Sequence, residues 1–150
     1  MSIKAQLKND VKEALKAGER LRLDALRMTL SEIQKLEIKA GEELAEADLQ
    51  GLLIKLVKQR RENAETFAEA GRTDLAEKEA AEAEHLSAYL PEQLSGDALA
   101  EAVSEILAEA GVSDIRDMGR AMGAVKRRLQ GRADLGEASS LVKLRLSGDG

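Results

Sequence analysis

Five glycines divide this chain into segments whose apolar residues recur at the spacing of an α-helix. They stand at positions 18, 41, 71, 111 and 131. Glycine commonly follows the last turn of a helix, and the segments between these glycines are of helix length. Leucine and alanine supply most of the apolar residues, and the chain has one proline. This pattern predicts an all-α protein of compact bundles, and the interruptions argue against a long coiled coil.

The periodicity predicts seven helices. We expect them at residues 2–17, 19–40, 48–70, 74–88, 97–110, 114–131 and 136–146. The helix at 19–40 is apolar around more of its circumference than the others. A helix with little polar surface is typical of the centre of a bundle, so we expect this helix to be central.

A break in the helical pattern at residues 89–97, Y-L-P-E-Q-L-S-G-D, indicates a boundary between two subdomains. Pro91 disfavours helical backbone at the residue before it, and Ser95, Gly96 and Asp97 favour a turn and a new helix start. We therefore predict an N-terminal multihelical bundle at residues 1–92 and a C-terminal three-helix subdomain at residues 93–150.

Charge is distributed unevenly along the chain, whose formal net charge is −5. Residues 1–40 hold nine basic and six acidic residues, residues 41–110 hold six and 17, and residues 111–150 hold eight and five. Basic ends on an acidic middle are compatible with nucleic-acid binding at those ends. There is no cysteine, no apolar run of signal-peptide length and no run that approaches a membrane span. From these features we expect a cytoplasmic protein that does not bind a membrane.

The sequence offers no set of residues for catalysis. It has no cysteine and one histidine, on an acidic helix, so no nucleophile–base pair and no Cys/His zinc site can be proposed. No glycine-rich phosphate loop is present. We expect no catalytic residues, no cofactor and no metal, which leaves binding as the class of function.

The segment at residues 115–132 combines an apolar stripe with a basic face. Met118 and Met122 belong to the stripe, and Gly119 and Gly123 lie beside it, where we expect them to permit close packing of another helix. Against one acid, Asp117, stand six cations that we predict to bind nucleic acid: Arg116, Arg120, Lys126, Arg127, Arg128 and Arg132. The alternative, a core helix with a solvated basic face, stays open.

A second basic cluster lies on the helix expected at 48–70. It consists of Lys55, Lys58, Arg60 and Arg61, which could bind phosphate or could pair with Glu62, Glu65 and nearby acids. Because aromatic residues are almost absent, stacking on unpaired bases is nearly unavailable. Any nucleic acid would be recognised through its phosphates and its folded shape.

Several motifs together resemble the GatB/YqeY family. They are R-L-D-A-L-R-M near residues 20–28, L-V-K-Q-R-R-E-N at 56–63, A-G-R-T-D-L-A at 70–76, Y-L-P at 89–91 and D-M-G-R-A-M-G…G-R-A-D at 117–134. The resemblance implies an all-helical fold similar to the C-terminal tail of the B subunit of glutamine-dependent tRNA amidotransferase. Leu135 stands where the family often has glycine, and this departure leaves the start of the last helix, expected near Gly136, open by a few residues.

The resemblance also implies a function. The amidotransferase tail meets the folded corner of tRNA, whereas nothing here matches the subunit's catalytic core, which uses ATP and magnesium. We therefore expect a tRNA-binding accessory domain linked by resemblance to carbon–nitrogen ligation with glutamine as amido-N donor, without a catalytic site of its own. The alternatives are a helical protein–protein adapter in translation, without RNA contact, and an enzyme that acts only through amidotransferase subunits as partners.

Overall fold

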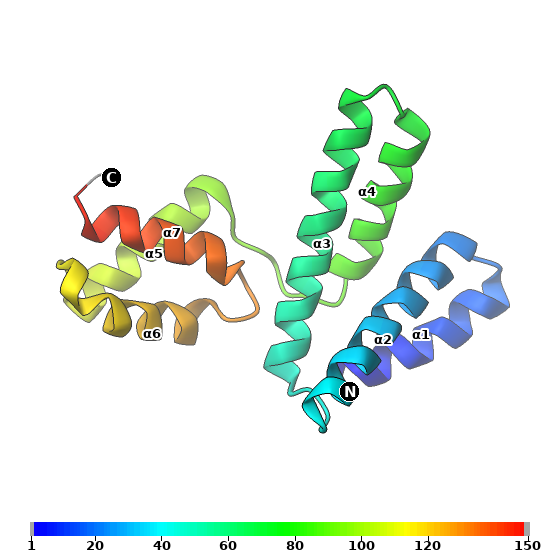
Figure 1. Cartoon of the computed structure of the whole chain (residues 1–150), viewed down its shortest axis with the longest axis horizontal. Coiled ribbons are helices and arrows are strands. Elements are labelled where there is room, and N and C mark those ends of the chain that lie inside the picture. Colours follow the sequence, from blue (N-terminus) through cyan, green and yellow to red (C-terminus); the bar gives the residue numbers. More distant parts are fainter. Residues whose placement is uncertain (1, 149–150) are drawn as a thin grey trace. The chain divides into compact units, whose positions relative to one another are not determined.

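The computed structural model describes residues 2–148, and every regular element in that range is helical (Figure 1). The elements are α1 (Ile3–Ala17), α2 (Arg20–Ala40), α3 (Glu46–Glu69), α4 (Thr73–Ser87), α5 (Gly96–Ala110), the short 3-10 helix η1 (Ile115–Asp117), α6 (Met118–Leu129) and α7 (Leu135–Leu146). The prediction of an all-α protein is confirmed. The chain divides into two compact units, with the boundary in the sequence between Pro91 and Glu92.

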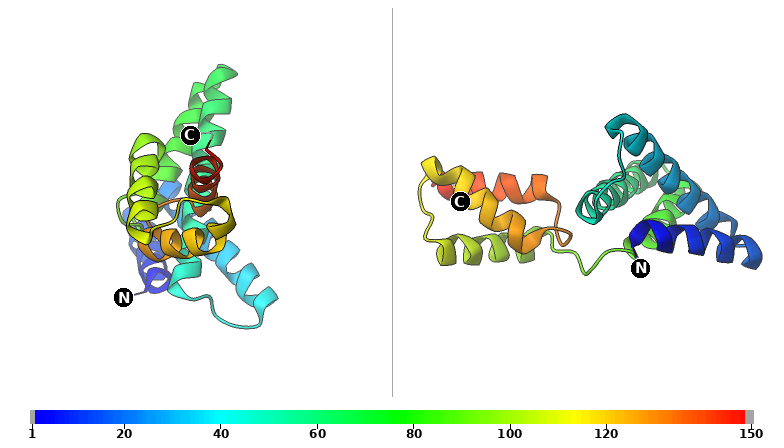
Figure 2. Two further views of the ribbon diagram at one scale, coloured as in Figure 1. Left: turned by 90° about the vertical axis from the view of Figure 1, so that its left-hand side faces the viewer. Right: turned by 90° about the horizontal axis from the view of Figure 1, so that it is seen from below.

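The N-terminal unit consists of two helical hairpins, α1–α2 and α3–α4, which can be followed in Figures 1 and 2. Ser2 caps α1 by accepting a hydrogen bond from the N–H of Ala5. Gly18, at φ +71°, turns the chain into α2. Leucine and isoleucine side chains from all four helices form one core: Leu7, Leu26, Ile33, Leu53 and Leu86 are almost completely buried.

The expectation that the second helix is central to its bundle is wrong. Met28, Leu36 and Ile38 of α2 are 56 %, 38 % and 74 % exposed. The physical reason is the position of α2, which packs mainly against α1 and α4 and presents its remaining surface to solvent. Apolar residues on several faces of a helix therefore do not prove that the helix is enclosed.

In the C-terminal unit, α5, α6 and α7 pack pairwise around a separate core. Its most buried members include Leu99, Val103, Val125 and Val142. The segment before α5 is tied to the loop after α6, because the N–H of Leu94 donates to the carbonyl of Arg132 at 2.7 Å. This hydrogen bond joins the chain at Leu94 to the C-terminal unit.

The helix expected at 114–131 differs from the prediction at both ends. Residues 115–117 form η1, whose first turn is capped by the Asp114 carboxylate accepting from the N–H of Arg116 at 2.9 Å. The helix ends at Leu129, before Gly131 takes φ +82°. The last helix begins at Leu135 rather than Gly136, with Asp134 as its N-cap.

Candidate nucleic-acid interface

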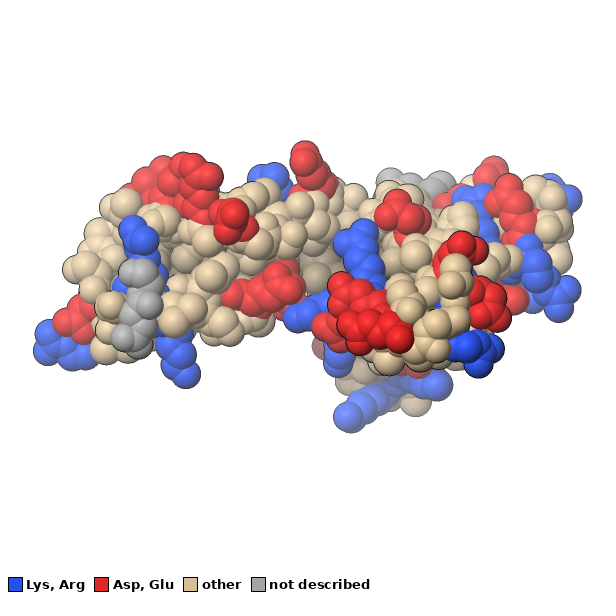
Figure 3. Space-filling model, turned by 90° about the horizontal axis from the view of Figure 1, so that it is seen from above, with Lys and Arg blue, Asp and Glu red and all other residues tan. Residues whose placement is uncertain are grey.

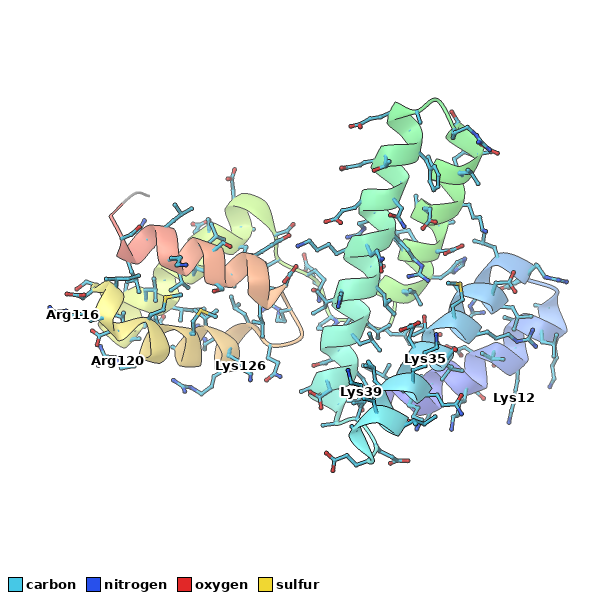
Figure 4. All side chains as sticks on the ribbon, viewed as in Figure 1. Lys12, Lys35, Lys39, Arg116, Arg120 and Lys126 are labelled. Atoms are coloured by element: carbon cyan, nitrogen blue, oxygen red, sulfur yellow. The ribbon has the colours of Figure 1, made fainter. Side chains whose placement is uncertain are left out.

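Helix α6 separates its apolar and basic residues onto opposite faces. Ala121, Val125 and Leu129 are buried against α5 and α7, whereas Lys126, Arg127 and Arg128 are exposed in the last turns. Figure 4 shows Arg116, Arg120 and Lys126 directed away from the three-helix core. Both faces follow from the helical repeat, so folding of the core also presents the cations to solvent.

Three of the six predicted cations form hydrogen bonds or ion pairs with neighbouring residues. Arg116 Nη2 lies 2.9 Å from Asp114 Oδ2, and Arg128 Nη1 bonds to Glu109 Oε2. Arg120 Nη2 donates to the carbonyl of Gly111 at 3.2 Å, with Asp117 Oδ2 at 3.9 Å. A cation with a partner must exchange or share it when it binds phosphate, so these three contribute less to anion binding than their number suggests.

The contact between Arg116 and Asp114 also acts on the carboxyl group. Hydrogen bonds from the Arg116 guanidinium, and then from the Arg116 N–H, hold the pKa of Asp114 below its ordinary value. The carboxylate therefore keeps its negative charge beside Arg116 at neutral pH. Because Arg116 is 88 % exposed, the pair is screened by water and salt.

The other three predicted cations, Lys126, Arg127 and Arg132, are exposed and form no ion pair with another residue in the described range. Arg127 folds back along its own helix, and its Nη1 lies 3.4 Å from the place where a Gly123 Cβ would stand. These three positions are the ones at which an external anion meets a cation without internal competition.

The basic face lies in a unit whose charges are segregated by helix. Helix α5 carries Asp97, Glu101, Glu105 and Glu109 and has no lysine or arginine, whereas α6 carries four cations and no acid. Figure 3 shows acidic side chains gathered into separate clusters on the face that it displays. An anionic polymer is therefore attracted toward α6 and repelled from α5.

The expected packing role of the α6 glycines is wrong within this chain. Gly119 is exposed, and a Cβ there would meet nothing within 4 Å. At Gly123 the neighbour is the Arg127 side chain, not another helix. The close helix contact is made instead by alanines such as Ala121, while Met118 and Met122 pack against the core as partly buried side chains.

The second basic cluster is divided by the structure. Arg60 is 6 % exposed, and its Nε donates to Glu82 Oε2 at 3.1 Å, so it belongs to the interior. Arg61 is exposed and lies 3.6 Å from Glu84. Lys55 and Lys58 are exposed. Arg60 and Arg61 thus pair with acids in the structure, and these acids come from α4 rather than being Glu62 and Glu65.

Several hollows lie beside cations of the C-terminal unit, and two of them bear on binding. One, of about 230 Å³, is lined by Ile106, Glu109, Ala110, Ala124, Arg127 and Arg128 between α5 and α6. The other, of about 520 Å³, is lined by Ile115, Ser140, Lys143, Leu144 and Ser147. The first places two guanidinium groups beside an apolar floor, an arrangement suited to a phosphate and its attached sugar.

Sequence reasoning missed the internal partner of one cation of this face and two further cations of the same unit. Glu109 lies 19 residues from Arg128, so no local pattern joins them. Lys143 and Arg145 of α7 are exposed in the same unit and were not counted. Within residues 2–148, no cluster of three or more His, Asp or Glu side chains could hold a metal ion. No helix in this range is long and apolar enough to cross a membrane.

Comparison with known proteins gives a match over residues 4–146 to the family described as "Yqey-like protein". The match covers nearly the whole chain and confirms the family resemblance found in the motifs. Similar proteins include "Altered inheritance of mitochondria protein 41, mitochondrial" of Lachancea thermotolerans, 41 % identical over 87 residues, which are 57 % of this chain and 46 % of the relative. The Candida glabrata protein of the same name is 38 % identical over 88 residues, 57 % of this chain and 48 % of the relative.

The aligned part of the chain spans about half the length of these fungal relatives. These relatives are named as mitochondrial proteins, which contradicts the expectation of a cytoplasmic protein. That expectation rested on the absence of cysteine and of an apolar leader, features that do not distinguish the cytoplasm from another reducing compartment.

Proposed function

Because the chain belongs to the YqeY-like family, we propose that it is an accessory protein that binds folded RNA, tRNA foremost, through phosphate contacts on α6. The observation that carries the proposal is the group of exposed cations that have no ion partner among residues 2–148: Lys126, Arg127 and Arg132. Lys126 and Arg127 lie on α6, a helix with no acidic residue, and Arg132 follows that helix. Phosphate contacts supply affinity with little sequence readout, which suits a protein almost without aromatic residues.

The hollow between α5 and α6 supports this proposal. A phosphate that meets Arg127 would bring its sugar over Ala110 and Ala124, where the short alanine side chains leave room. Arg128 lies at the rim, paired with Glu109, so a phosphate there would have to share or displace that carboxylate and Arg127 would make the main contact.

The test is a salt titration of tRNA affinity for paired variants. Lys126→Ala combined with Arg127→Ala is expected to weaken binding about tenfold or more and to lower the slope of log affinity against log salt by about two. The control, Lys143→Ala combined with Arg145→Ala, removes the same charge from α7 of the same unit and should change affinity far less. Equal affinities for wild type and the α6 variant would overturn the proposal.

The family resemblance extends the proposal to the setting in which the RNA is bound. We propose that the chain assists a glutamine-dependent amidotransferase, whose carbon–nitrogen ligase chemistry lies in the partner subunits. The purified chain should form no amide on mischarged tRNA, and adding it to a complete amidotransferase should lower the tRNA concentration needed for half-maximal rate. No change in that concentration would remove this part of the proposal.

The hollow on α7 favours a second candidate function, that of a protein–protein adapter. Ile115 and Leu144 are 42 % and 48 % exposed at its edges, and Lys143 lies beside them. An apolar hollow beside a cation is suited to an amphipathic segment that carries an acid. A stoichiometric protein partner that survives nuclease treatment and is lost in Leu144→Glu would favour this candidate over RNA binding.

A further inference from the structure

The α1–α2 hairpin of the N-terminal unit holds a further concentration of cations, apart from the basic clusters on α3 and α6. Residues 1–40 contain nine lysine and arginine residues and six acids. Figure 4 shows Lys12, Lys35 and Lys39 extending from α1 and α2. The hairpin is the basic half of its unit, because α3 and α4 carry most of the unit's acids.

Internal ion pairs use most of the acids of this hairpin. Lys4 Nζ lies 2.7 Å from Glu37 Oε1, Arg22 meets both Asp10 and Glu19, and Lys35 Nζ is 3.5 Å from Glu32. Two acids of the hairpin, Glu13 and Asp24, are left outside these pairs. The exposed cations that form no ion pair within residues 2–148 are more numerous: Lys8, Lys12, Lys16, Arg20, Arg27 and Lys39.

Helix α2 arranges its cations along one outward surface. At 3.6 residues per turn, Arg20, Arg27, Lys35 and Lys39 fall within one third of the helix circumference, opposite the buried Leu26 and Ile33. Asp24 is the one acid that the helical repeat places in the same third. The helix is about 30 Å long, so the row spans several phosphate spacings of a nucleic-acid strand.

Exposed apolar side chains stand among these cations. Met28 follows Arg27 and is 56 % exposed, and Ile38 precedes Lys39 and is 74 % exposed. A polymer with charged phosphates and apolar sugar surfaces offers partners for both kinds of side chain. The mixture distinguishes this surface from a simple solvated helix face, where lysines alternate with acids.

We propose that the outward surface of α2, with the neighbouring lysines of α1, is a second RNA phosphate-binding surface. This inference rests on the proposed function, which places the first surface on α6, and it adds that each unit of the chain contacts the same RNA. Two linked surfaces raise the affinity for an RNA long enough to reach both, since the second contact becomes intramolecular.

The test uses the full chain and a folded tRNA transcript at several salt concentrations. The hairpin variant carries Arg20→Ala, Arg27→Ala and Lys39→Ala. Its control, Lys55→Ala with Arg61→Ala and Arg72→Ala, removes equal charge from exposed positions of the other hairpin. We expect the hairpin variant to lose about tenfold or more in affinity and two to three units of salt slope, and the control to lose much less. Circular dichroism should show unchanged helix content in both.

The outcomes separate this inference from the proposed function. If the hairpin variant binds like wild type while the Lys126→Ala, Arg127→Ala variant does not, the second surface is refuted and the first stands. If the wild-type protein binds no RNA, both the α2 surface and the α6 surface are refuted.

A parallel experiment measures binding to phosphatidylglycerol–phosphatidylcholine vesicles. Vesicle binding that is lost in the hairpin variant, with unchanged tRNA affinity, would overturn the RNA assignment in favour of a membrane surface.

Discussion

Arg60 Nε donates to Glu82 Oε2 across 3.1 Å, and both side chains are 8 % exposed. The pair joins α3 to α4 in the interior of the N-terminal unit. Arg60 Nη1 also reaches the carbonyl of Leu56 at 3.5 Å, and Lys78 Nζ lies 3.9 Å from the second oxygen of Glu82. Because two charges inside a protein are stabilised mainly by each other, the register of the two helices depends on keeping both.

Removing one member of this pair should destabilise the protein more than removing both. Arg60→Ala leaves Glu82 buried without its main partner, and we expect a loss of about 3 kcal/mol or more in the free energy of unfolding. The double variant Arg60→Met, Glu82→Met should be closer to wild type, since no charge is left buried. Urea denaturation of the three proteins measures these differences. A loss below about 1 kcal/mol for Arg60→Ala would show that the pair is not desolvated.

Gly119 provides a test that separates stability from binding. It lies in α6 with open space where a Cβ would stand, so Gly119→Ala should stabilise the protein by about 0.5–1 kcal/mol. If RNA approaches the helix backbone at this point, the same variant should bind tRNA more weakly although it is more stable. Thermal unfolding measures the stability of the variant and tRNA titration measures its affinity, both on the same preparation.

Gly51 is a matched control for this experiment. It lies inside α3 of the other unit and likewise has nothing within 4 Å of a Cβ. Gly51→Ala should therefore give a similar gain in stability with unchanged tRNA affinity. A loss of stability in Gly119→Ala would contradict the open geometry of that site and would restore the packing role first expected of it.

Apart from the segment at 114–131, helix boundaries could be predicted from the sequence to within about two residues, as could the apolar stripes of single helices, because both depend on neighbours within one or two turns. Gly18 ends α1 through its own backbone preference, and Val125 with Leu129 are buried at the spacing that the repeat requires. The basic face of α6 was likewise foreseeable, since it is the complement of the same stripe.

What could not be predicted depends on residues far apart in the chain. The partner of Arg60 is 22 residues away and that of Arg128 is 19 residues away, so neither cation could be assigned to the interior or to an ion pair by spacing. The exposure of Ile38 depends on how many helices pack around α2, and the sequence of α2 alone does not determine that number. The open space at Gly119 is likewise a property of its surroundings.

Glu37 should give part of the stability a dependence on acid. Its carboxylate accepts from Lys4 Nζ at 2.7 Å and from the N–H of Leu44 at 3.0 Å, and these hydrogen bonds, that of Lys4 first, lower the pKa of Glu37. A group with a lower pKa in the folded state stabilises the fold above its unfolded-state pKa, and this contribution is lost as the pH falls through the folded-state pKa. The stability difference between wild type and Glu37→Gln should be largest at neutral pH and should shrink in acid. Urea midpoints at pH 7 and in acid measure it, and a difference that grows toward acid would contradict this sign.

Tyr89 and Asp10 connect the end of α4 to α1. The Tyr89 hydroxyl donates a short hydrogen bond to Asp10 Oδ2, and Arg22 Nη2 lies 3.7 Å from the same oxygen. Burial, and then the hydrogen bond to Asp10, raise the pKa of Tyr89, so the hydroxyl keeps its proton at neutral pH.

Tyr89→Phe retains the ring but removes the donor, and we expect a loss of about 1–2 kcal/mol in the free energy of unfolding. Asp10→Asn, which keeps an acceptor for the hydroxyl, should cost less. If Tyr89→Phe unfolds at the urea midpoint of wild type, the bond does not hold α4 against α1.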